Sequence, residues 1–89
     1  MTVPRYLNPP SLLTPVAPYS HVSRAADLVH LAGQAGEDAD GRLVSDRVDG
    51  QLAQAFENVR LALDSQGLGL DSVVKLTIYL VGRETVSDF

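Results

Sequence analysis

The sequence contains no cysteine, and this absence excludes three kinds of chemistry at once. A chain without cysteine forms no disulfide, binds no metal through thiolates and offers no thiol nucleophile. Clustered positive charge is missing as well, because the seven Lys and Arg residues are scattered and the net charge is −4. A protein that binds the phosphate backbone needs grouped cations, so the sequence argues against nucleic acid as a partner.

Long apolar runs are also absent. The longest is far below the roughly 20 residues of a membrane-spanning helix. The first ten residues, MTVPRYLNPP, include one Arg and three prolines where a signal peptide needs a continuous apolar stretch. We therefore expect a cytoplasmic protein with no membrane partner.

Eighty-nine residues give room for one domain. All five prolines lie at or before Pro18. Because proline lacks a backbone donor, residues 1–18 are predicted to be an extended, largely irregular arm, followed by a domain over residues 19–89.

Two short strand-like runs open this domain. They cover residues 19–23 and 28–32, and a turn over residues 24–27 joins them, which is typical of an antiparallel hairpin. Gly33, at the end of the second run, predicts a bulge or the close approach of another group to the backbone. Residues 37–41 have the composition of a tight turn.

The clearest element is a helix from about Val48 to Gln66. Asp46 or Ser45 is placed to cap its start, and Gly67 occupies the position of a left-handed residue after its end. Leu61 alone departs from the apolar stripe and could mark a contact with another chain. The stripe itself recurs at helical spacing: Leu52, Phe56, Val59 and Leu63, widened by Val48, Ala55 and Ala62.

Residues 73–81 alternate as a strand does. One face is apolar and is predicted to lie under the helix, whereas the other is mixed and could solvate a surface, line a semi-polar cavity or meet another subunit. The two faces are Val74, Leu76, Ile78 and Leu80 on the apolar side, and Lys75, Thr77 and Tyr79 on the mixed side.

The last residues are typical of the start of a helix, with Thr85 or Ser87 as its N-cap. The sequence ends at Phe89, within the first turn of this predicted helix. Three strands and one helix leave sheet edges unpaired. We therefore expect this chain to be the N-terminal part of a small α+β subunit, or to depend strongly on partner chains.

Taken alone, the residues indicate no reaction. His21 and His30 are the only histidines, and we expect structural or surface roles for both. The acidic residues at 37–46 do not have the spacing of a calcium loop, and the segment at 33–36 matches neither a dinucleotide fingerprint nor a P-loop. We predict no metal site and no cofactor.

Three stretches carry a family pattern in order and spacing: APYSHVSRAADLVHLAGQAGEDADGRLV, QLAQAFENVRLALDSQGLGLDSVVKLTIYLVG and the closing SDF. In these stretches the chain resembles the RidA family (also YjgF or L-PSP) of small imine-processing proteins. The resemblance implies a chorismate-mutase-like α+β fold and a homotrimer with a central barrel. It also implies ligand clefts between subunits, and the mixed face of residues 73–81 would then belong to the barrel or to a cleft.

The resemblance also implies a site. Tyr19 matches the cleft tyrosine of the family, and Ala32, Gly33 and Gln34 match its Ser-Gly-Gln turn, with Ala32 in place of the usual Ser. The carboxylate-binding Arg and a supporting Glu of the family fall after Phe89, so the catalytic residue stays unknown. Arg24 and Arg83 do not occupy the matching position.

Two functions follow from the resemblance. The first is hydrolysis of reactive enamines and imines, such as 2-aminoacrylate, to a 2-keto acid and ammonia. The second is the role of a catalytically silent member that binds small carboxylates or metabolites at the same cleft. Ala32 slightly favours this second function, because it lacks the hydroxyl of the usual Ser.

Overall fold

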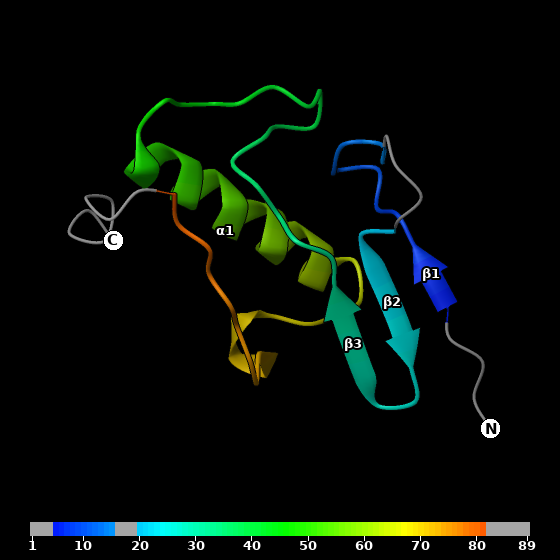
Figure 1. Ribbon diagram of the computed structural model, residues 1–89. Coiled ribbons are helices and arrows are strands. Elements are labelled where there is room, and N and C mark those ends of the chain that lie inside the picture. Colours follow the sequence, from blue (N-terminus) through cyan, green and yellow to red (C-terminus); the bar gives the residue numbers. More distant parts are fainter. Residues whose placement is uncertain (1–4, 16–19, 82–89) are drawn as a thin grey trace.

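The computed structural model describes residues 5–15 and 20–81 and has an α+β architecture with an antiparallel sheet (Figure 1). The α+β class predicted from the sequence is therefore confirmed. Over the described ranges, no helix is both long and apolar enough to cross a membrane. The elements are β1 (Arg5–Leu7), β2 (Val22–Ala25), β3 (Leu28–Leu31), α1 (Val48–Asp64) and a short 3-10 helix (Leu70–Ser72), and the sheet order is β1-β2-β3.

Strands β2 and β3 form the predicted hairpin, but with a tighter turn. Ala25 pairs with Leu28, so only Ala26 and Asp27 lie outside the ladder. Ala26 has a φ of 52°, the left-handed conformation that matches a two-residue turn to the twist of the strands. The predicted four-residue turn was wrong, because Arg24 and Ala25 still pair within the ladder. Strand β2 consequently lies later in the chain than predicted.

Strand β1 lies inside the segment predicted to be an irregular arm. It pairs antiparallel with β2, so that Leu7 is opposite Val22. The prolines of this region lie outside the strand, and residues 5–7 therefore keep their backbone donors.

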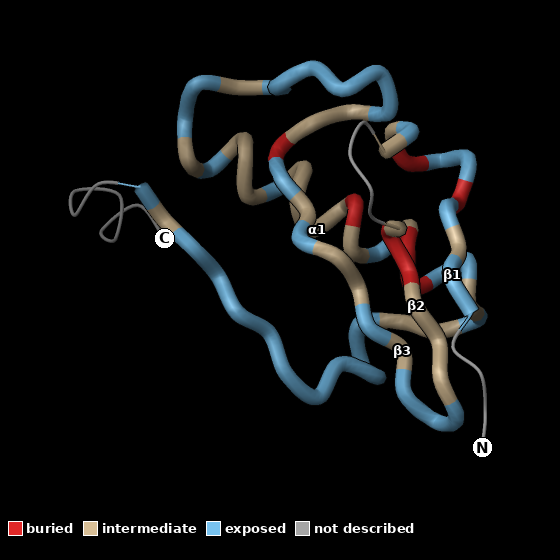
Figure 2. Tube along the Cα trace, turned by 45° about the vertical axis from the view of Figure 1, so that its right-hand side comes forward, coloured by how far each residue is buried: buried red, intermediate tan, exposed pale blue. Residues whose placement is uncertain are grey.

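The core lies between one face of the sheet and the C-terminal half of α1 (Figure 2). Leu7, Val22 and Leu31 are opposite one another in the ladder, and because opposite residues share a face, all three point toward the helix. Leu61 packs against this cluster, so its departure from the predicted stripe reflects contact with this chain's own sheet. The buried residues of this cluster are Leu12, Val22 and Ala62, and the partly buried residues that pack against them are Leu7, Val29, Leu31 and Leu61.

The ends of α1 differ in how well they were predicted. At the start, Arg47 is the N-cap and no side chain caps the helix, since the Ser45 hydroxyl accepts from the Arg47 amide instead (3.0 Å). The prediction of a Ser45 or Asp46 cap was therefore wrong. At the end, Gly67 is left-handed (φ 71°) and the Leu68 amide donates to the Leu63 carbonyl at 2.9 Å, which confirms the predicted glycine stop.

Residues 73–81 do not form the predicted strand. They run along α1 outside the helices and strands of the described residues, and most of them are exposed (Figures 1 and 2). A strand exists only through its ladder, and in the described residues no neighbour offers this segment one. Of the face predicted to lie under the helix, Leu76 lines an open hollow together with the helical residues Phe56 and Val59, whereas Val74 is 92% exposed. The predicted N-cap residues, Thr85 and Ser87, lie outside the described residues.

Candidate functional site

The candidate site is the loop that leaves β3, formed by Ala32, Gly33 and Gln34 and called here the 32–34 loop. The Ala32 amide donates to the His21 carbonyl at 2.9 Å and so continues the hairpin ladder for one bond beyond β3. The side-chain amide of Gln34 then folds back and donates to the Ala32 carbonyl at 3.2 Å. These bonds hold the loop in one conformation against the start of β2.

Gly33 is the open point of the 32–34 loop. A Cβ built on it would have no heavy atom within 4 Å apart from its chain neighbours, so the described chain leaves open the space that a side chain would occupy here. Within the described chain, a close approach to a glycine occurs at Gly36 in the same segment, whose Cβ would lie 2.7 Å from the Cα of Gln51. Gly36 thus lets the chain pass against α1, and Gly33 leaves its backbone accessible to a small ligand.

His21 supports the 32–34 loop from beneath and is only 2% exposed. Its ring Nε2 lies 2.7 Å from the Leu13 carbonyl and its Nδ1 lies 3.1 Å from Nε2 of Gln34. Its backbone amide donates to Oδ1 of Asn8 at 2.8 Å. The imidazole therefore links the N-terminal segment, β2 and the candidate loop, which confirms a structural role for this histidine. The hydrogen bond to Gln34 was not foreseen from the sequence.

Asn58 anchors the chain on the other side of the loop. It is 5% exposed on α1, and its Nδ2 donates to the carbonyls of Ala35 (3.0 Å) and Glu37 (2.8 Å). Its Oδ1 accepts from Gln54 at 3.0 Å. Asn58 was not predicted from the sequence. It lies three positions after Ala55 and four before Ala62, so helical spacing places it on the inward face of the helix, and a polar residue on that face was the available signal.

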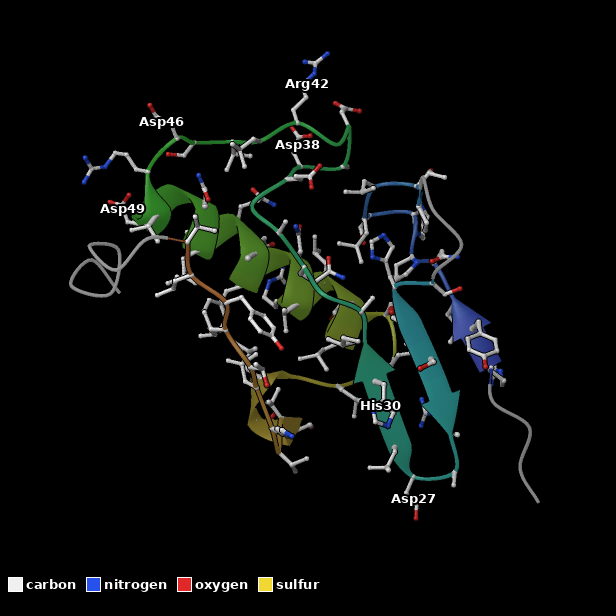
Figure 3. The ribbon with its side chains drawn as sticks, viewed as in Figure 1. Asp27, His30, Asp38, Arg42, Asp46 and Asp49 are labelled. Carbon is white, nitrogen blue, oxygen red and sulfur yellow. The ribbon has the colours of Figure 1, made fainter. Side chains whose placement is uncertain are left out.

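The acidic residues after the loop form the predicted turn. Oδ1 of Asp38 accepts from the amides of Asp40 (2.9 Å) and Arg42 (3.0 Å), and Gly41 is left-handed. Figure 3 shows Asp38 and Arg42 on this loop, well separated from His30 on β3. Across residues 5–15 and 20–81, no three His, Asp or Glu side chains gather as metal ligands would.

Two open hollows lie elsewhere on the chain, and neither includes the 32–34 loop. One, of about 210 Å³, is apolar and is lined by Phe56, Val59, Leu70, Val73 and Leu76. The other, of about 260 Å³, lies at the start of α1 beside residues 79–81. The first is almost devoid of polar atoms, and the second combines the carboxylate of Asp46 with the polar side chains of Gln51 and Tyr79. Of the predicted site residues, Tyr19 lies outside the described residues, while Ala32, Gly33 and Gln34 are brought together as one loop.

Comparison with known proteins identifies the family of the chain. A family model described as endoribonuclease L-PSP matches residues 10–89. A RutC family protein of Pyrococcus horikoshii is 34% identical over 67 residues, which cover 74% of this chain and 53% of the relative. A protein of Dermatophagoides farinae named 2-iminobutanoate/2-iminopropanoate deaminase is 27% identical over 90% of this chain and 63% of its own length.

Solved structures agree on the fold. Yeast Mmf1 superposes with a TM-score of 0.89 at 22% identity, over 97% of this chain and 69% of that one. This chain therefore spans about half to two-thirds of the length of the relatives that it matches. The match across residues 10–89 shows that the chain belongs to the L-PSP family, which is the RidA/YjgF family that the sequence pattern resembles.

Proposed function

We propose that this protein hydrolyses reactive enamine and imine intermediates, such as 2-aminoacrylate, to 2-keto acids and ammonia. The observation that carries the proposal is the family match over residues 10–89, together with the deaminase named among its relatives. An RNA-cleaving role is less well supported, because the net charge of −4 and the scattered cations disfavour a phosphate backbone.

The geometry of the 32–34 loop fits a small ligand. Gly33 leaves its backbone open, and Gln34 carries an amide that is held in place by Ala32 and His21. In the proposed reaction the enamine tautomerises to the imine, water adds to the imine carbon, and the C–N bond breaks with release of ammonia. The protein needs to bind and orient the substrate, and we propose Tyr19 and the 32–34 loop for this role.

We further propose a homotrimer with a chorismate-mutase-like barrel, in which the ligand lies between subunits. The surface of residues 73–81 supports an assembly, because Val74 and Val81 are 92% and 91% exposed and Tyr79 is 90% exposed. Contiguous exposed apolar side chains are costly in water and mark contact surfaces. Native mass spectrometry is expected to give three copies, and a monomer would count against a shared cleft.

The activity is tested on the full-length gene product. Incubation with 2-aminoacrylate is expected to accelerate the appearance of pyruvate and ammonia over the uncatalysed rate, and Gly33→Val is expected to remove the acceleration because a branched side chain blocks the open backbone. His30→Leu, on the exposed outer face of β3, is the matched control and should retain activity. Equal rates with and without the wild-type protein would remove the enzyme proposal.

The second candidate is a silent member that binds small carboxylates. Ala32 favours it, since the methyl group replaces a hydroxyl that the family pattern places in this loop. The two candidates differ in the family's carboxylate-binding Arg, whose position falls after Phe89. Reading the gene beyond that codon separates them: an Arg in a Pro-x-Arg context predicts turnover, and another residue there predicts binding of a 2-keto acid without ammonia release.

A further inference from the structure

The hydrogen bonds around His21 and Gln34 form a series that ends at a backbone carbonyl on each side, and these two carbonyls decide which groups are donors. At one end, the Leu13 carbonyl lies 2.7 Å from Nε2 of His21. At the other, the Ala32 carbonyl lies 3.2 Å from Nε2 of Gln34. Between them, Nδ1 of His21 faces the same Gln34 nitrogen at 3.1 Å. Backbone carbonyls only accept hydrogen bonds, and each end therefore demands a donor.

These demands leave one arrangement for the two side chains. Nε2 of His21 carries the ring proton and donates it to Leu13. The Gln34 amide turns its nitrogen inward, because a flipped amide would place its oxygen against the oxygen of Ala32. An amide nitrogen donates and does not accept, so Nδ1 of His21 is the unprotonated acceptor. The geometry thus assigns Nε2 as the donor nitrogen of the ring and Nδ1 as its acceptor.

The arrangement commits both hydrogens of the Gln34 amide and leaves its oxygen available. One hydrogen goes to His21 and the other to Ala32. Within residues 5–15 and 20–81, Oε1 of Gln34 accepts no hydrogen bond, and no buried side-chain polar atom there lacks a partner, so this oxygen lies at the accessible surface. It is next to Gly33, which faces open space.

We infer that His21 is a positioning residue that fixes the Gln34 amide, so that Oε1 accepts a hydrogen bond from an N–H group of the ligand. The inference rests on the proposed function for the class of ligand. An imine or enamine carries such an N–H, whereas the 2-keto acid product has a carbonyl oxygen at the same place. The Gln34 oxygen therefore attracts the substrate and repels the product, which favours selective binding and product release.

The preference is measured with two stable ligands of nearly equal shape. Pyrrole-2-carboxylate has a ring N–H beside the carboxylate, and furan-2-carboxylate has an oxygen acceptor there. In calorimetric titration, wild-type full-length protein is expected to bind the pyrrole about tenfold more tightly than the furan. The pyrrole N–H gains a hydrogen bond to the Gln34 oxygen, whereas the furan oxygen is repelled by it. Equal binding, or tighter binding of the furan, would overturn the inference.

Variants at position 21 separate positioning from mere packing. His21→Gln keeps an amide donor for Leu13 and an oxygen acceptor for Gln34, and it is expected to retain the pyrrole preference. His21→Leu removes both groups and is expected to bring the two ligands within about twofold of each other. His30→Leu, the same substitution at the exposed histidine of β3, should leave the preference intact. Loss of the preference in the His21→Gln protein and its retention in a folded His21→Leu protein would contradict the assignment.

A measurement on the wild-type protein avoids the risk that His21→Leu does not fold. Long-range ¹H–¹⁵N NMR of the imidazole is expected to show the ring proton on Nε2. A ring protonated at Nδ1 would overturn the inference. These measurements do not depend on turnover. If the protein prefers the pyrrole but releases no keto acid, only the deaminase proposal is refuted. If it turns over substrate without preferring the pyrrole, only the role of His21 and Gln34 is refuted.

Discussion

Replacing Asn58 by Ala is expected to destabilise the fold by about 2–3 kcal/mol. The substitution deletes the donors that satisfy the carbonyls of Ala35 and Glu37. A hydrogen bond contributes a net 0.5–1.5 kcal/mol, roughly, so two lost bonds cost about 1–3 kcal/mol. Because Asn58 itself is only 5% exposed, we expect the upper part of this range, and water that enters the vacated space lowers it.

Gln54→Ala is the matched control for this experiment. Gln54 donates only to Oδ1 of Asn58, from a half-buried position on the same helix, so its loss should cost about 0.5–1 kcal/mol. Urea unfolding, at one protein concentration, measures both variants. With a slope of about 1–1.5 kcal/mol/M, the midpoint of Asn58→Ala should fall by about 2 M. A midpoint no lower than that of Gln54→Ala would refute the anchoring role of Asn58.

Three further predictions concern single positions. Gly36→Ala is expected to destabilise the protein by about 1–3 kcal/mol in thermal unfolding, because the new Cβ would lie 2.7 Å from the Gln51 backbone. Gly33→Ala should unfold within about 0.5 kcal/mol of wild type, since its Cβ meets nothing, yet should weaken pyrrole-2-carboxylate binding in the same titration used above. The hydrogen bonds from Arg60 lower the pKa of Glu57, so the contribution of this pair is present at neutral pH and is lost as pH falls through that lowered pKa. Glu57→Gln should flatten this acid dependence of the unfolding midpoint, and an unchanged pH profile would contradict it.

The elements that depend on nearby residues were predictable. The hairpin, the acidic turn and the helix end at Gly67 are each decided within a few residues, by alternation, turn composition and a left-handed glycine. The start of α1 was not, because Ser45 and Asp46 are both plausible caps and the hydroxyl of Ser45 binds the Arg47 amide instead.

What the sequence could not show is contact between distant positions. Residues 73–81 alternate as a strand does, but pairing needs a neighbour, and alternation carries no information on whether one is present. The bonds of His21 to Gln34 and of Asn58 to Glu37 span 13 and 21 residues. The family pattern identified Gln34 without its partner, and the histidine that orients it emerged only from the three-dimensional arrangement.

If ligands bind at the 32–34 loop, a chemical-shift titration will place them there. Full-length protein labelled with ¹⁵N is titrated with pyrrole-2-carboxylate, a ligand suited to both the enzyme and the silent binder. We predict saturable shifts at the amides of Gly33 and Gln34 and at the Gln34 side-chain amide. Shifts confined to the apolar hollow around Phe56 and Leu76, or no saturable shifts at all, would contradict the account.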